Sequence, residues 1–115
     1  MGVDFIGHGD FSLPWHMWRP CFELAVAFGW QPAGTIAHPD FKGHWSGTYF
    51  ANDCQEVSDE DARAMAEALY GALSALKPKQ KLTAEQRKAW ADEDVGVFSV
   101  FHLAEYADKG GFAIL

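Results

Sequence analysis

The clearest hydrophobic pattern in the chain lies near its centre, where apolar residues recur at helical spacing. After Ser58 and three consecutive acids, apolar residues repeat every three to four positions as far as Lys77-Pro78. These positions are Ala62, Met65, Ala66, Leu69, Leu73 and Leu76. The stripe predicts an amphipathic helix of about five turns, because residues three and four apart share one helix face. Pro78 ends it, since the residue before a proline avoids helical geometry.

A capping signal marks the start of this helix. Ser58 is a preferred N-cap residue, and its hydroxyl is expected to accept a hydrogen bond from the backbone N–H of Asp61. The Asp61 carboxylate is expected to reach back to Ser58, which makes a capping box with aspartate in place of glutamate. Asp59, Glu60 and Asp61 then face the positive end of the helix dipole.

An earlier apolar stripe predicts a first helix. Val3 to Ile6 is typical of a short strand, and Ser12 with Pro14 resembles a helix start, with Ser12 as the N-cap. The stripe consists of Trp15, Trp18, Phe22, Ala25 and Val26. Pro20 interrupts it, which predicts either a kink or a helix that begins near Pro20. Gly29 is the expected stop, with Trp30 folding back over the last turn.

The region between these two helices has no clear period. Residues 31–47 contain two prolines and three glycines, and are expected to form a loop with a short extended piece near Thr35-Ile36. Gly47 to Phe50 is expected to be extended. Gln55 to Val57 is expected to pair with it across a turn at Asn52-Asp53.

The last third of the chain predicts two helices and a strand. Thr83 and Gln86 form a second capping box, which opens a short helix to about Asp92. A further helix, stopped by Lys109-Gly110-Gly111, is expected from the apolar positions Val97, Val100, Phe101 and Ala104. Phe112 to Leu115 is typical of a terminal strand that pairs with Val3 to Ile6 or with the central hairpin. The predicted fold is α+β: a small, mostly antiparallel sheet covered on one face by three to four helices.

Length and composition predict one compact domain, residues 1–115. The chain has 115 residues, 49% of them hydrophobic and 15% aromatic, which is ample material for a core. No apolar run approaches the roughly 20 residues of a membrane-spanning helix, and the first residues lack the basic start of a signal peptide. Cys21 and Cys54 have no CxxC spacing and fit reduced thiols. We therefore expect a cytoplasmic protein that does not engage membranes.

The net charge of the chain indicates which kind of partner it can bind. The net charge is −7, so double-stranded nucleic acid is not expected to be a direct ligand, because its binding depends on neutralising phosphates with Lys and Arg. Five acids and no base lie between Asp53 and Asp61. The compensating bases are Lys77, Lys79, Lys81, Arg87 and Lys88. The acids are explained either by ordinary dipole matching at a helix end or by a face that docks a basic partner.

The sequence offers little support for catalysis or for a cofactor. His38, Asp40 and His44 share one loop and are candidates for a zinc site; His38 and Asp40 with distant His102 superficially match the ligand set of non-haem iron. Cys54 lies in the most acidic segment, which opposes formation of a reactive thiolate. The chain has no nucleophile elbow, P-loop or dinucleotide fingerprint. We expect no cofactor and no enzymatic activity.

The aromatic residues before the central helix are the remaining candidates for function. Most aromatic side chains are expected in the core, but Trp45 and Tyr49 lie in a loop, and Trp and Tyr dominate binding hot spots. Aromatic residues beside acids, without bases, suit a protein partner more than a nucleic acid. The predicted contact residues are therefore Trp45, Tyr49, Asp53, Glu56, Asp59, Glu60 and Asp61.

One run of residues resembles a known group of sequences. It reads Trp45-x-Gly47-x-Tyr49-Phe50-x-Asn52-Asp53-x-Gln55-x-Val57-Ser58, followed by Asp61-Ala62 and a helix rich in Ala and Leu. The run is similar to small proteins of bacterial and prophage genomes that have no known activity. Cys54 stands where such proteins are expected to have glycine, and Pro20 where their helix is expected to continue. The resemblance implies no particular activity.

These observations favour a non-catalytic, acidic interaction protein. The leading hypothesis is an inhibitor from a phage or mobile element that blocks a basic, nucleic-acid-handling defence complex, in the manner of anti-CRISPR proteins. The first alternative is an immunity protein against a toxin nuclease. The second is a small metal-binding protein or enzyme that uses the loop from His38 to His44.

Overall fold

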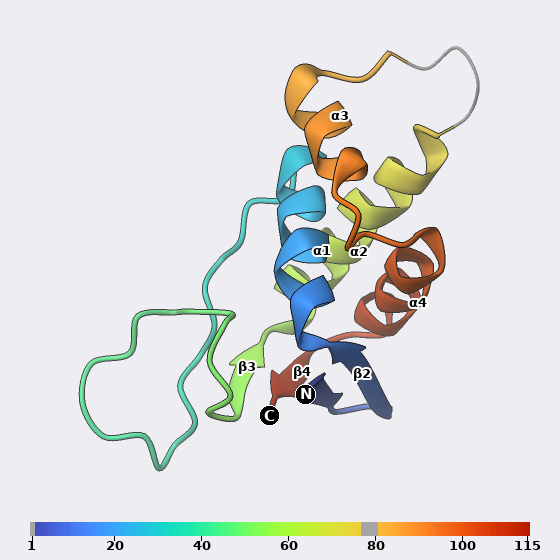
Figure 1. The fold of residues 1–115 in the computed structure, drawn as a ribbon. Helices are drawn as coiled ribbons and strands as arrows, with labels where there is room; N and C mark the ends of the chain where they lie inside the picture. The colour runs from blue at the N-terminus through green and yellow to red at the C-terminus, as the bar shows by residue number, and fades with distance from the viewer. Residues whose placement is uncertain (1, 77–80) are drawn as a thin grey trace.

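The computed structural model describes residues 2–76 and 81–115, in which strands and helices follow the order ββαβαααβ (Figure 1). The strands are β1 (Gly2–Ile6), β2 (Asp10–Pro14), β3 (Gln55–Val57) and β4 (Phe112–Ile114). The helices are α1 (Trp15–Ala27), α2 (Asp59–Ser74), α3 (Ala84–Ala91) and α4 (Val97–Asp108). The sheet has the order β2-β1-β4-β3, with every neighbouring pair antiparallel. The predicted α+β class is confirmed.

The helices form a layer on one face of the sheet and extend beyond it. Helices α1 and α4 contact the sheet directly, α2 packs against both of them, and α3 packs on α1 at the far end (Figure 1). The molecule is therefore elongated, with extents of 49 × 24 × 24 Å. The sheet and α3 lie at opposite ends. No helix in the described ranges is long and apolar enough to cross a membrane.

The first two strands form a hairpin, which corrects the predicted start of the first helix. Val3 pairs with Leu13 and Phe5 with Phe11, and these side chains turn toward the helices. Ser12 is not an N-cap: it lies opposite Asp4, and its hydroxyl donates to Asp4 Oδ1 at 2.7 Å. The alternation of polar and apolar residues along β2 outweighs the local capping preference.

Helix α1 runs through Pro20 and does not begin there. Pro14 occupies the N-cap position, and the helix continues to Ala27. Its end is as predicted: Gly29 has φ +104°, and the Trp30 N–H donates to the Ala25 carbonyl at 3.0 Å. The chain turns back because glycine adopts this left-handed conformation without steric cost.

The central hairpin is absent, and the terminal strand takes its place. Strand β3 pairs with β4 instead of with Gly47 to Phe50, and β4 also pairs with β1. The buried Gln55 side chain explains the difference, because it holds the preceding residues in a loop. Its Nε2 donates to the Ala51 carbonyl at 2.6 Å, and its Oε1 accepts from the Asp53 N–H at 3.0 Å. The predicted terminal strand is confirmed.

The helices in the second half begin as predicted. Thr83 Oγ1 accepts from the Gln86 N–H at 3.1 Å, and Gln86 Oε1 accepts from the Thr83 N–H at 3.0 Å, so the second capping box is confirmed. Helix α4 is also confirmed, although Val97 and Phe101 point to solvent. The predicted stop at Lys77-Pro78 lies outside the described residues.

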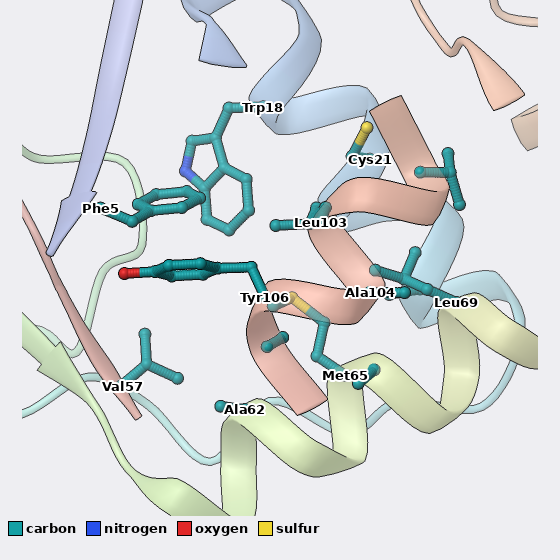
Figure 2. Close-up of a cluster of buried hydrophobic side chains, with 14 of the residues drawn as sticks. Phe5, Trp18, Cys21, Val57, Ala62, Met65, Leu69, Leu103, Ala104 and Tyr106 are labelled. Atoms are coloured by element: carbon teal, nitrogen blue, oxygen red, sulfur yellow. The ribbon is translucent and has the colours of Figure 1, made fainter. Parts of the chain in front are cut away.

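One core joins the sheet to α1, α2 and α4. Phe5 and Trp18 meet edge to face, with ring centroids 5.0 Å apart, and Tyr106 stacks beside Phe5 at 6.2 Å (Figure 2). Leu69 and Leu103 extend this cluster between α2 and α4 (Figure 2). The core includes buried residues from Val3 to Ile114, so the described elements share a single hydrophobic interior.

Candidate functional site

Two of the residues predicted to contact a partner lie inside the protein. Tyr49 and Asp61 are each only 4% exposed, and the Tyr49 hydroxyl donates to Asp61 Oδ2. The prediction that they belong to an exposed face is therefore wrong. Burial, together with the hydrogen bond to Asp61, raises the pKa of Tyr49, which keeps the phenol protonated as a donor.

Asp61 anchors the long loop between α1 and β3. Its Oδ1 accepts from the Trp30 indole N–H at 3.0 Å and from the Ala33 N–H at 3.1 Å. Half of the predicted capping box is confirmed, since Ser58 Oγ accepts from the Asp61 N–H at 3.2 Å. The other half is wrong: the Asp61 carboxylate turns away from Ser58 and binds donors that lie far away in the sequence.

Side chains of the loop before β3 stabilise the loop itself. The half-buried Trp45 donates its indole N–H to the Thr35 carbonyl at 3.1 Å, and its ring meets Phe41 edge to face at 4.9 Å. Asn52 Nδ2 donates to the Leu115 carbonyl at 2.7 Å. Trp45 therefore joins two parts of the loop, and Asn52 joins the loop to the end of β4. Packing and hydrogen bonding within the protein are therefore sufficient to explain why these aromatic and polar residues occur here.

The side chains predicted as candidate metal ligands do not come together in the structure. His38 Nδ1 accepts from the Asp40 N–H at 3.1 Å, whereas His102 lies on α4 beside Glu105, at 3.4 Å. Within residues 2–76 and 81–115, no three His, Cys, Asp or Glu side chains are grouped to hold a metal ion. Cys21 is buried in the core, and this burial raises the pKa of its thiol to about 12. A thiol in that state is not a nucleophile near neutral pH.

The remaining predicted acids are exposed, and one of them points from the open face of the sheet. Asp53, Glu56, Asp59 and Glu60 are all at the surface. Within β3, Gln55 and Val57 are buried against the helices, so Glu56 faces the opposite way. Glu56 therefore lies on the face that the helices leave uncovered.

A row of residues crosses this open face. Ile6 pairs with Ala113, Ala113 pairs with Glu56, and Glu56 forms a bridge with Ile36. The neighbouring residue on each side in β1, β3 and β4 is buried or lies at a strand end, so the row points outward. Ile6 and Ile36 are 44% and 56% exposed. We call these four residues the open-face row.

A groove of about 430 Å³ lies over the open-face row. Its walls include both isoleucines and Ala113, and its acids are Glu56 and Asp59. Asp59 Oδ1 accepts from the Gly111 N–H at 2.7 Å, which fixes the carboxylate at the rim. Gly111 allows this close approach, since a Cβ there would lie 2.5 Å from the Val57 carbonyl oxygen.

Two further acids, which were not among the predicted contact residues, join this face. Asp4 and Asp10 lie on β1 and β2, where a second hollow of about 240 Å³ is bounded by both acids and by Ile6. None of the four strands contains Lys or Arg. The alternation of Asp4 and Ile6 with the buried Val3 and Phe5 was the signal that could have found Asp4. Recognising Asp10 required the hairpin register.

Three of the described bases lie away from the sheet, whereas Arg63 on α2 and Lys109 before β4 lie nearer to it. Lys81, Arg87 and Lys88 are on or beside α3, at the opposite end of the molecule (Figure 1). Lys77 and Lys79, the other predicted members of this patch, lie outside the described residues. Throughout the described part of the chain, the ion pairs of carboxylates within 4.0 Å involve histidines alone. The described lysines and arginines therefore leave the acids of the sheet face unpaired.

No family model, curated protein or solved structure matches this chain. The resemblance to small bacterial and prophage proteins therefore stays a prediction.

Proposed function

We propose that this protein is a non-catalytic, acidic interaction protein whose open sheet face binds a basic surface of a partner protein. The contact residues are Asp4, Asp10, Glu56 and Asp59, with Asp53 and Glu60 beside them. They replace the predicted set, from which Tyr49 and Asp61 drop out because they are buried. Trp45 serves to hold its loop.

The observation that carries the proposal is the one-sided charge of the sheet. Its exposed face holds carboxylates on β1, β2 and β3, exposed isoleucines between them and no base on any strand. Complementary potentials of this kind steer association and select partners. Interface centres are typically apolar with a polar rim. On this face the apolar Ile6 and Ala113 lie side by side, with Asp10 next to Ile6 and Glu56 next to Ala113.

We further propose that the partner is a nucleic-acid-handling protein of the bacterial cytoplasm. A surface evolved to bind phosphates is rich in Lys and Arg, and an acidic sheet face occupies such a surface as a competitor of the nucleic acid. An inhibitor of a defence complex, in the manner of anti-CRISPR proteins, fits this chemistry. An immunity protein that covers a toxin nuclease uses the same contact, and the identity of the captured partner separates the two.

The test is affinity capture from a bacterial lysate with matched charge variants. The sheet-face variant carries Asp10→Asn, Glu56→Gln and Asp59→Asn. The control variant carries Glu67→Gln, Glu85→Gln and Glu93→Gln, which are exposed acids on or near the helices. Both variants gain the same charge, so they separate the position of the acids from the net charge of the protein.

We expect the wild type and the control variant to capture the same basic, nucleic-acid-binding protein at low salt, and the sheet-face variant to lose it. About 0.5 M salt, where the Debye length is roughly 4 Å, should release it. Equal capture by the two variants, or capture that salt does not weaken, would contradict the proposal.

A further inference from the structure

The groove over the open-face row has apolar walls and is lined by two acids, Glu56 and Asp59. Ala113 is the small residue of the row, and it leaves a hollow between Ile6 on one side and Glu56 with Ile36 on the other. The two isoleucines expose about half of their surface, and their exposed apolar area favours contact with methylene groups. A long side chain with an apolar stem and a cationic head matches both the walls and the acids.

The acids of the groove retain acceptor capacity. Asp59 uses Oδ1 for the Gly111 N–H, and a carboxylate offers two oxygens with about four lone-pair sites. Glu56 uses its backbone in the bridge to Ile36, with N···O distances of 2.8 and 2.9 Å, so its side chain takes no part in the pairing. In the described structure, neither carboxylate has a Lys or Arg partner within 4.0 Å.

Resting on the proposed function, we propose that this groove binds one arginine side chain of the basic partner. A guanidinium presents five N–H donors in a planar fork, so it can bond two carboxylates at once, whereas the lysine ammonium is a compact point charge. The Arg stem lies between Ile6 and Ile36 over Ala113, and the head group meets Glu56 and Asp59.

Arg63 of this protein is the nearest internal competitor. It lies one helical turn after Asp59, and its Nη2 is 3.6 Å from the position that a Cβ on Gly110 would take. It forms no ion pair with Asp59 within 4.0 Å, and the groove lining does not include it. Removing this charge with Arg63→Ala should strengthen arginine binding.

The test uses capped pentapeptides with the sequence Gly-Gly-X-Gly-Gly, in which X is arginine, lysine or citrulline. Citrulline preserves the shape of arginine without its charge. Methyl and amide chemical shifts are followed by NMR during titration of the wild type, Ala113→Leu, Glu56→Gln and the control Glu93→Gln. The amide spectrum of each variant verifies that the fold is retained.

We expect the arginine peptide to shift the methyl signals of Ile6, Ile36 and Ala113 selectively. Ala113→Leu fills the groove and should abolish saturable binding, and Glu56→Gln should weaken it about tenfold, as for loss of one charge-assisted hydrogen bond. Glu93→Gln should bind as the wild type does. Lysine should bind more weakly, and citrulline should not bind.

Binding of lysine or citrulline as tight as that of arginine would overturn the inference, as would unimpaired binding by Ala113→Leu. The outcome is independent of the lysate capture. If the sheet-face variant loses its partner but Ala113→Leu keeps it, the proposed function stands and the arginine groove is wrong. If the arginine peptide binds selectively but no basic partner is captured, the groove stands and the proposed function is wrong.

Discussion

At the scale of single residues, one buried carboxylate decides how the middle of the chain is held. Asp61 accepts from the Tyr49 hydroxyl, from the Trp30 indole and from the backbone of Ala33. A buried charged group is tolerated only when its hydrogen-bonding capacity is satisfied, and here neutral donors satisfy it. The same residue is therefore unavailable to a partner.

Replacing Asp61 with alanine should be strongly destabilising. The change leaves the Tyr49 hydroxyl, the Trp30 indole N–H and the Ala33 N–H without their acceptor. The first two are buried, and each unsatisfied buried group costs about 1–3 kcal/mol. We expect a loss of at least about 3 kcal/mol in the free energy of unfolding, measured by urea denaturation. Glu60→Ala, an exposed neighbour, is the control; an equal effect of both changes would contradict the anchoring role.

Cys54 is strained, and glycine should relieve the strain. Cys54 is the one non-glycine residue of the described chain with a positive φ, +58°. That conformation costs a non-glycine residue about 1–2 kcal/mol, offset in part by the greater unfolded-state entropy of glycine. Cys54→Gly should raise the free energy of unfolding by about 1 kcal/mol. Cys54→Ala keeps the Cβ and should give no gain; a matching gain from alanine would show that the thiol, not the backbone, is responsible.

The buried thiol predicts a loss of stability in alkali. In the folded protein burial raises the pKa of Cys21 to about 12, whereas an unfolded thiol has a pKa near 8.5. The folded state thus holds its proton while the unfolded state releases it, and the free energy of unfolding falls as pH rises from about 8.5 toward 12. Urea denaturation of Cys21→Ala should show a decline shallower than wild type by about 1 kcal/mol per pH unit. Parallel declines would exclude Cys21 as the cause.

At the scale of elements, the sequence predicted the helices well and the strand pairing in part: the terminal strand pairs with β1 as expected, but the central hairpin does not form. The stripe from Ala62 and the capping box at Thr83 are local signals, and both helices begin where predicted. The partner of β3 is β4, more than fifty residues later, and no local spacing encodes that choice. The loop between α1 and β3 likewise depends on Asp61, whose partners Trp30 and Ala33 lie 31 and 28 residues earlier in the sequence.

The candidate site was likewise predicted only in part from the sequence. Glu56 and Asp59 were predicted because they belong to a visible run of acids. Asp10 joins them only after the hairpin register is known, whereas the alternation along β1 already places Asp4 on the face opposite Val3 and Phe5. Tyr49 was predicted to lie at the surface because the presence of an aromatic residue does not show whether it packs inside the protein or contacts a partner.

Helix α1 tolerates a proline that weakens it. Pro20 lies inside the helix and has no N–H to donate to the His16 carbonyl. Pro20→Ala should restore that hydrogen bond and raise the free energy of unfolding by about 2 kcal/mol, after allowance for the more flexible unfolded chain. Pro14→Ala, at the N-cap position, is the control and should give no gain. Destabilisation by Pro20→Ala would show that the proline ring itself packs usefully.

At the scale of the whole molecule, charge and shape are organised along one axis. The sheet with its acids is at one end, and α3 with Lys81, Arg87 and Lys88 is at the other (Figure 1). The bases of α3 are well beyond a Debye length of about 10 Å at 0.1 M salt, so they do not weaken the field of the sheet acids. Arg63 lies closer but forms no ion pair with Asp59 within 4.0 Å. The proposed binding of a basic partner depends on this placement of the acids more than on the net charge of −7.

The most direct test is the affinity of a deca-arginine peptide for the two matched variants at low salt, measured by isothermal titration calorimetry. Asp10→Asn, Glu56→Gln and Asp59→Asn together should weaken binding by about tenfold, as for three exposed ion pairs. Glu67→Gln, Glu85→Gln and Glu93→Gln together should change it by less than about twofold. Equal losses in the two variants would contradict the account, because only net charge would then matter.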